Sequence, residues 1–194
     1  MTASPTFAQL VSLACHDLRT PLATASGFAH TLQRLDALEP PADRYVEMIG
    51  MASAQIGHLL DLLGAAARME AGRFEAQVVT ADSRELADGA AAMLEPDRAS
   101  VEGTGVEVRV DPKWVQVAIA AVAECVRRHG ALDSVTLSVD GAEVSIGPVG
   151  EGVAEIAFGR ELKDFGSAVA TKLLETSGVA LEEDGDRLVA RLPQ

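Results

Sequence analysis

Basic residues are scarce in this sequence. Its 16 lysines and arginines are outnumbered by 29 acidic residues, so the formal net charge is -13. A protein that binds phosphate backbones needs clustered lysine and arginine, so this balance argues against nucleic acid and against an anionic membrane surface as partners. Aromatic residues make up only 4% of the 194 positions while alanine is abundant, a composition that favours helices packed through small side chains.

Cysteines and long apolar runs are also rare. Cys15 and Cys125 are the two cysteines, and two distant thiols form neither a secretory disulfide framework nor a recognisable metal-ligand spacing. A stretch of about 18 apolar residues is absent, and the N-terminal MTASPTFAQL lacks the charged segment and apolar core of an export signal. We therefore expect a cytoplasmic protein without a membrane segment and without a metal site of its own.

Residues 5 to 71 carry the periodicity of two long helices. Apolar or small residues first recur in steps of three and four, which is one face of a helix. Two prolines in LEPPADR interrupt this pattern, because proline does not fit a helix interior. A second stripe with heptad spacing follows and stops before Gly72. The stripes run through Phe7, Leu10, Ala14, Leu18, Pro21, Ala25, Phe28, Leu32 and Leu35, then through Tyr45, Ile49, Ala52, Ile56, Leu59, Leu63 and Ala66.

The two stripes predict an antiparallel helical hairpin over residues 1–72. A lone hairpin cannot bury such broad apolar surfaces on both of its helices, whereas two hairpins packed together can. We therefore expect a homodimer in which two hairpins form a four-helix bundle.

His16 lies off these stripes. It is two residues from a stripe position on either side, so at about 100° per residue it points away from both and faces solvent. Asp17 could hold the Nδ1 proton of the imidazole and leave Nε2 unprotonated, the form that attacks phosphorus. Thr20 follows one turn later on the same face, and Arg19 could offset phosphate charge. The four residues together predict a site for phosphoryl transfer.

The segment HDLRTPL, residues 16–22, resembles the H-box of the dimerisation and histidine-phosphotransfer domain of bacterial sensor histidine kinases. In that family the histidine is phosphorylated, the acidic residue after it assists as a base, and the threonine four residues on supports dephosphorylation of the partner. The resemblance implies these roles for His16, Asp17 and Thr20. It also implies an ATP-binding α/β sandwich of the Bergerat type in the rest of the chain.

Residues 73–194 have the pattern of such a sandwich. Strand and helix patterns follow the order β-α-β-α-β-β-α-β-β, with hairpin turns at Asp140-Gly141 and around Asp184-Gly185 and a helix that stops before Gly178. The expected fold class is therefore α+β, with a helical hairpin over 1–72 and a Bergerat-type α/β sandwich over 73–194.

The nucleotide contacts of the resembled family are mostly replaced. Ala121 and Cys125 stand where asparagines of the family surround magnesium, with Glu124 at the acidic position, and neither alanine nor cysteine is a ligand for this hard ion. Pro148 replaces the aspartate that accepts the adenine amino hydrogen, and Asp164 replaces a glycine where the triphosphate passes. The remaining glycines of these motifs are Gly150, Gly152 and Gly166. We therefore expect a degenerate ATPase-like domain that binds no cofactor.

A phospho-acceptor hairpin joined to such a domain resembles the dimeric histidine phosphotransferases, which look like degenerate histidine kinases. The resemblance implies that His16 takes a phosphoryl group from the aspartyl phosphate of one receiver domain and passes it to the aspartate of another, without ATP. The receivers, one of them belonging to an upstream hybrid histidine kinase, are the implied partners, and they supply the Mg²⁺.

Two other functions stay open at the level of sequence. The chain could be an active histidine kinase that binds ATP through altered contacts. It could instead be a non-catalytic pseudokinase that docks a response regulator and blocks or dephosphorylates it. Phosphorylation from ATP distinguishes the kinase, and an activity that survives His16→Ala distinguishes the regulator.

Overall fold

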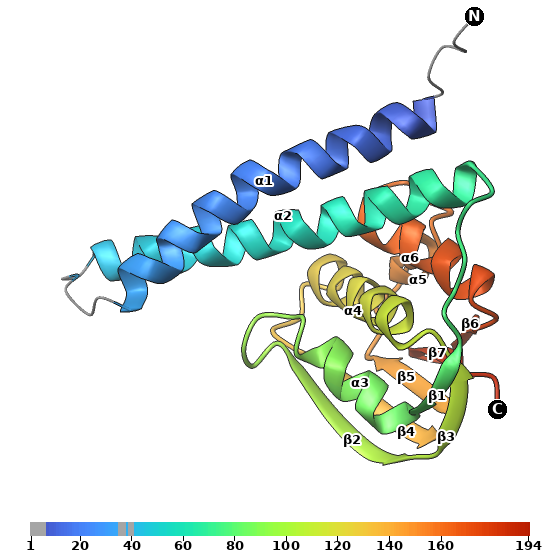
Figure 1. The fold of residues 1–194 in the computed structure, drawn as a ribbon. Coiled ribbons are helices and arrows are strands. Elements are labelled where there is room, and N and C mark those ends of the chain that lie inside the picture. The colour runs from blue at the N-terminus through green and yellow to red at the C-terminus, as the bar shows by residue number, and fades with distance from the viewer. Residues whose placement is uncertain (1–6, 35–37, 39–40) are drawn as a thin grey trace, which may run out of the picture. The chain divides into compact units, whose positions relative to one another are not determined.

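Two long helices form the first of the two units into which the chain divides, residues 1–74. The computed structural model describes residues 7–34, 38 and 41–194. Helix α1 (Phe7–Arg34) packs along α2 (Ala42–Glu70) as the predicted antiparallel hairpin (Figure 1). The predicted break at LEPPADR and the stripe residue Leu35 fall partly outside the described residues. Gly72 follows α2 with φ of +63°, a conformation that glycine adopts without strain.

The buried side chains of the hairpin are mostly not those of the predicted stripes. They include two series, one on each helix, whose members are spaced at multiples of seven residues. Many of these side chains are small. Small side chains let two helices approach closely. The large apolar side chains of the stripes are left largely exposed in the single chain, as Phe28 (68%) and Tyr45 (59%) illustrate. The buried series are Ala8, Cys15 and Ala29 on α1, and Val46, Ser53, Leu60 and Ala67 on α2.

The second unit, residues 75–194, alternates strands with helices. Five strands form one sheet in the order β2-β4-β5-β7-β6, in which β2 and β4 are parallel and the other neighbours antiparallel, while β1 and β3 form a separate antiparallel pair. The elements are β1 (Val79–Asp82), α3 (Ser83–Ala91), β2 (Ala99–Gly105), β3 (Glu107–Val110), α4 (Pro112–His129), β4 (Val135–Gly141), β5 (Glu143–Gly147), α5 (Val153–Ala157), α6 (Phe165–Thr176), β6 (Ala180–Asp184) and β7 (Arg187–Arg191).

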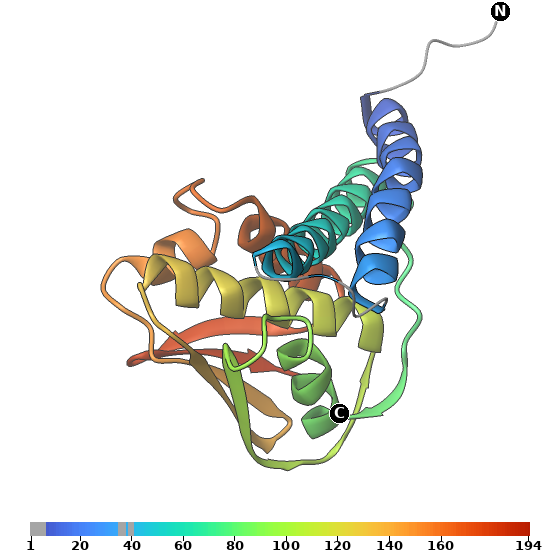
Figure 2. The same ribbon diagram turned by 90° about the vertical axis from the view of Figure 1, so that its left-hand side faces the viewer.

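Helices α3, α4 and α6 pack on one another and form a layer over one face of the five-stranded sheet (Figures 1 and 2). Burial alternates along β4, where Val135, Leu137 and Val139 are buried and the residues between them are less so. One face of that strand therefore supplies the core, and α4 meets it with fully buried residues such as Ile119 and Val122. The predicted α+β fold, a helical hairpin followed by a two-layer α/β sandwich, is confirmed.

The predicted turns are also confirmed. Asp140 pairs with Glu143 and Asp184 pairs with Arg187, so each hairpin has a two-residue connection. Each connection begins with a glycine at positive φ, Gly141 at +57° and Gly185 at +62°. Positive φ at this place gives the turn the twist that its strands need, which is why Asp-Gly predicts hairpins well.

Strand β2 and helix α5 were not predicted from the sequence. β2 reads ASVEGTG and lies at the edge of its sheet, so it needs no regular apolar alternation. α5 has only five residues, too few for a helical period to show. Within the described part of the chain, none of the helices combines the length and apolar character needed to cross a membrane.

Asp111 joins β3 to α4 and provides a test of how the second unit is stabilised. Its buried carboxylate caps α4 by accepting a hydrogen bond from the Trp114 amide at 3.3 Å, and it accepts a second from the Gln77 amide at 2.7 Å. Because alanine leaves both amides without this acceptor, we expect Asp111→Ala to lower the free energy of unfolding by about 2–3 kcal/mol.

Urea unfolding followed by circular dichroism measures this loss. Asp111→Asn is the matched control, because its amide oxygen still accepts one of the two bonds, and we expect it to lose less. Equal stability of wild type and Asp111→Ala would contradict the role of this carboxylate.

Candidate functional site

His16 projects from α1 into solvent, with 81% of its side chain exposed. Its Nδ1 lies 3.1 Å from Asp17 Oδ1. When Nδ1 carries the ring proton and donates a hydrogen bond to Asp17, Nε2 keeps its lone pair and is free to act as a nucleophile. The structure therefore places the Asp17 carboxylate against Nδ1 of an exposed His16.

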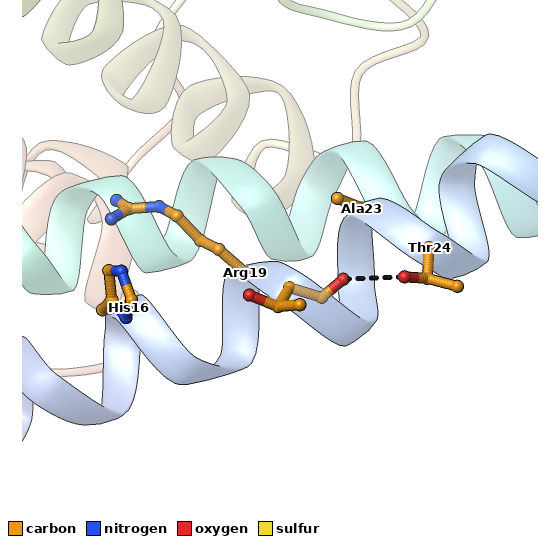
Figure 3. A pocket seen from close by; sticks show the side chains of 5 residues that line it. His16, Arg19, Ala23 and Thr24 are labelled. Atoms are coloured by element: carbon orange, nitrogen blue, oxygen red, sulfur yellow. Dashed lines mark hydrogen bonds between the residues drawn. The ribbon is translucent and has the colours of Figure 1, made fainter.

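An open depression on α1 surrounds the histidine (Figure 3). Its lining residues lie three or four positions apart, so their side chains share one face of the helix. Arg19 and Thr20 line it together with His16, and Ala23 adds no bulk. The Thr20 carbonyl accepts a hydrogen bond from Thr24 Oγ1 at 3.0 Å. His16, Arg19 and Thr20 thus present an imidazole, a guanidinium and a hydroxyl on one face of α1.

Arg19 has a partner that the sequence analysis did not identify. Its Nη2 lies 2.5 Å from Oδ1 of Asp61 on α2, in an ion pair whose side chains are 46% and 34% exposed. Asp61 therefore holds the guanidinium of Arg19 beside His16 and competes with any phosphate for it. The two residues are 42 positions apart, so only the register of the hairpin reveals the pair.

In the second unit, Asp164 fills the N-terminus of α6. Its buried carboxylate is the N-cap of that helix, accepting a hydrogen bond from the Ser167 amide at 2.9 Å, and it also pairs with the guanidinium of Arg128. A helix N-terminus attracts anions because its first amides lack partners and carry partial positive charge. At α6 the chain's own carboxylate takes the position that a phosphate would otherwise favour.

The side chains of α4 at the expected magnesium-binding positions are neutral or already paired. Burial is the main reason that the pKa of the Cys125 thiol is raised to about 11; the charge of Asp164 acts in the same direction and a hydrogen bond with Ser167 opposes it. Glu124 accepts two hydrogen bonds from Arg127, at 2.8 and 2.7 Å, and this pairing raises the pKa of Arg127. Ala121 offers no ligand atom. These residues do not fit a magnesium–nucleotide complex, which requires oxygen ligands.

Four further residues stand at the expected nucleotide-binding motifs: Pro148, Gly150, Gly152 and Gly166. Gly152 precedes α5 with φ of +75°, and the Gly150 carbonyl accepts a hydrogen bond from the Val153 amide at 3.1 Å. Gly166 is buried in the first turn of α6, and Pro148 is exposed after β5. The positive φ of Gly152 accounts for a glycine at that position without any ligand.

Two sequence comparisons identify relatives. Residues 8–72, which include most of α1 and all of α2, match the His Kinase A (phospho-acceptor) domain. Over 182 residues, 88% of this chain, the sequence is 30% identical to the histidine protein kinase DivJ of Caulobacter vibrioides. The match spans 28% of DivJ, so this chain corresponds to little more than a quarter of that relative.

Solved structures of histidine kinases have the same fold. Full-length ShkA, crystallised in complex with AMPPNP, matches 96% of this chain and 45% of its own with a TM-score of 0.57 and 19% identity. The Acinetobacter baumannii histidine kinase AdeS matches 91% of this chain and 95% of its own with a TM-score of 0.53 and 16% identity. At these identities the likeness shows the fold, a helical hairpin followed by an α/β domain.

The phospho-acceptor domain, the identity with DivJ and the shared fold agree with the exposed His16 and its acidic neighbour. The alignment with DivJ and the shared fold extend over both units of the chain and not over the hairpin alone. The chain is thus a histidine kinase-like protein, in which a helical hairpin similar to a phospho-acceptor domain is followed by an α/β domain with the fold found in histidine kinases.

Proposed function

We propose that this chain is a cytoplasmic histidine phosphotransfer protein in which His16 exchanges phosphoryl groups with receiver-domain aspartates and ATP is not used. The observation that carries the proposal is the carboxylate of Asp164 at the N-terminus of α6, paired with Arg128. A triphosphate approaching this helix would meet a buried negative charge in place of free amides. Together with Cys125 and Ala121 on α4, this supports a domain that keeps the kinase fold without kinase chemistry.

The transfer step needs only groups that the hairpin and its partner present. Nε2 of His16 attacks the phosphorus of the receiver's aspartyl phosphate, and the N–P bond forms as the P–O bond to the aspartate breaks. Asp17 stays paired with the Nδ1 proton and stabilises the charge that the ring acquires. Positioning and charge neutralisation dominate such reactions. Mg²⁺ held by the receiver supplies the remaining positive charge, and the reverse sequence donates the group to a second receiver.

We further propose that the working form is a homodimer. Large apolar side chains on both helices are exposed in the single chain, among them Leu18 (52%) and Phe28 (68%) on α1 and Ile49 (50%) and Ile56 (48%) on α2. Exposed apolar surface of this extent on paired helices is typical of an interface. Two hairpins packed as a four-helix bundle would bury it while the face that carries His16 stays accessible.

An ATP-dependent kinase is the second candidate, and the relationship to DivJ favours it. The 30% identity extends over 88% of the chain and therefore includes the α/β unit as well as the hairpin. A kinase that uses altered nucleotide contacts would share both units with DivJ. The source of the phosphoryl group separates the two proposals.

We expect labelled phosphate to reach the protein from a phosphorylated receiver domain with Mg²⁺, and none to arrive from Mg²⁺ and labelled ATP. His16→Ala should abolish the labelling, because it removes the attacking nitrogen. Gel electrophoresis with autoradiography measures both reactions.

His30→Ala is the matched control for this experiment, since His30 is another exposed histidine of α1 and should be labelled normally. Label arriving directly from ATP would reject the proposal in favour of the kinase. Dephosphorylation of a receiver that persists unchanged in His16→Ala would favour a non-catalytic regulator.

Thr20 shares the depression with His16, and its hydroxyl can orient a water molecule toward a receiver's phosphoryl group. We expect Thr20→Ala to slow dephosphorylation of the receiver by about a hundredfold, the lower end of the range for a positioned proton-transfer group, and to leave labelling of His16 within about twofold. Release of inorganic phosphate from the phosphorylated receiver measures the first rate. Thr31→Ala on the same helix is the control, and a Thr20→Ala rate equal to it would remove Thr20 from the site.

The Arg19–Asp61 pair sets how freely Arg19 can meet a phosphoryl group on His16. We expect Asp61→Asn to shift the transfer equilibrium toward phosphorylated His16 by up to about fivefold, because an exposed ion pair worth about 0.2–1 kcal/mol no longer competes for the guanidinium. Arg19→Ala should shift the equilibrium the other way. The ratio of phosphorylated protein to phosphorylated receiver at equilibrium measures both effects.

Asp43→Asn is the control for Asp61→Asn, because it makes the same change of charge at the far end of α2. An equilibrium that Asp61→Asn leaves at the Asp43→Asn value would show that Asp61 does not restrain Arg19.

A further inference from the structure

The second unit contains a group of metal-ligating side chains that phosphotransfer does not use. Cys125 and His129 lie four residues apart on α4, so their side chains project from one face of that helix. Asp164 reaches the same place from the N-cap of α6. The sulfur, a ring nitrogen and a carboxylate oxygen of these three residues all lie within 4.8 Å of one another. Three different ligand types from two helices thus converge on one point.

Two of the three side chains are buried, and the third, His129, has a buried ring nitrogen without a hydrogen-bond partner among the described residues. Cys125 is 0% exposed and Asp164 is 7% exposed. Nε2 of His129 is a buried atom that has no hydrogen-bond partner among the described residues, although it lies 3.4 Å from Asp164 Oδ2. A buried nitrogen without a partner destabilises the fold, and it therefore calls for an explanation.

We propose that Cys125, His129 and Asp164 form a binding site for a thiophilic divalent cation of the zinc class. Thiolate, imidazole and carboxylate are the ligands that zinc takes in proteins, whereas magnesium and calcium select oxygen alone. Tetrahedral bonds of about 2.0–2.1 Å place a nitrogen and an oxygen ligand roughly 3.3 Å apart, close to the 3.4 Å between His129 Nε2 and Asp164 Oδ2. Three protein ligands leave the fourth position to water.

The charges and protons of this binding reaction balance. The metal–sulfur bond forms as the Cys125 thiol proton leaves to solvent, and no group changes its oxidation state. His129 binds as neutral imidazole, so thiolate and carboxylate together offset the two positive charges of the cation. Arg128 pairs with the same Asp164 oxygen that faces His129. Its side chain is 57% exposed, so it can turn to solvent when the cation arrives.

A cation at this site would fasten the C-terminal end of α4 to the start of α6. It would stabilise the folded chain, because the unfolded chain has no preformed site. The site is independent of whether His16 exchanges phosphoryl groups with a receiver. Two of its ligands, Cys125 and Asp164, occupy positions where the nucleotide contacts of the kinase resemblance are replaced.

Cobalt(II) is the probe for the site, because a cobalt–thiolate bond gives a charge-transfer absorption in the near ultraviolet. The full chain is treated with a chelator, reduced and titrated with Co²⁺. We expect one equivalent to bind with this absorption, and Zn²⁺ but not Mg²⁺ to remove it. Cys125→Ser should abolish the band, while the matched control Cys15→Ser should keep it. No band at a tenfold excess of Co²⁺, or a band that is lost with Cys15, would overturn the proposal.

His129→Gln is a second variant that keeps the test decisive if Cys125→Ser does not fold. His129 is the last residue of α4 and is partly exposed, so glutamine is expected to be tolerated there. The band should persist with an affinity reduced by roughly tenfold or more, since even the loss of a hydrogen-bond partner of a ligand costs about 10–100-fold. An unchanged affinity in a folded His129→Gln protein would overturn the site.

Arg128→Gln tests the carboxylate ligand without touching it. Removing the guanidinium frees Asp164 Oδ2, so Co²⁺ affinity should rise in this variant. Arg127→Gln is the control, since Arg127 pairs with Glu124 and does not approach Asp164 in the ion pairs described. An affinity that stays equal to the control would overturn the assignment of Asp164 as a ligand.

Discussion

The ion pair between Asp164 and Arg128 is the interaction on which the character of the second unit depends. A carboxylate that leaves water must be compensated, and this one is compensated by the Ser167 amide, the positive end of α6 and the guanidinium of Arg128. The same carboxylate occupies the N-terminus of α6, which would otherwise attract phosphate. It also places a negative charge beside Cys125, where it helps to keep the thiol protonated. One side chain therefore sets both the local stability and the chemistry of the region.

His16 is under the opposite constraint, because the proposed phosphoryl transfer requires exposure. Its depression is open to solvent and cannot exclude water by itself, so the proposed transfer needs a docked partner to complete the enclosure and to supply most of the electrostatic stabilisation. The hairpin contributes what a helix surface can provide: a nucleophile, an acidic neighbour that orients it, a hydroxyl and a restrained cation. The buried side chains between α1 and α2, many of them small, hold the two helices together beneath this surface.

The hydrophobic core of the second unit does not depend on the residues at its expected nucleotide positions. Large side chains such as Leu86, Ile119 and Leu173 are fully buried between the helices and the sheet. Burial of apolar surface stabilises this arrangement whatever stands at the nucleotide positions, so the frame tolerates Cys125 and Pro148. Similarity to histidine kinases therefore shows the fold and does not decide the reaction.

The sequence by itself determined the periodic elements and the local motif. Helical stripes, Asp-Gly turns and HDLRTPL act over a few residues, so their consequences for structure are local and readable. The edge strand β2 and the short α5 gave too little pattern to read. Only the tertiary structure decided which residues meet across long separations: Arg19 with Asp61, Asp164 with Arg128, and the convergence of Cys125, His129 and Asp164. These contacts depend on the register of helices packed together, which the spacing of residues along one chain segment does not encode.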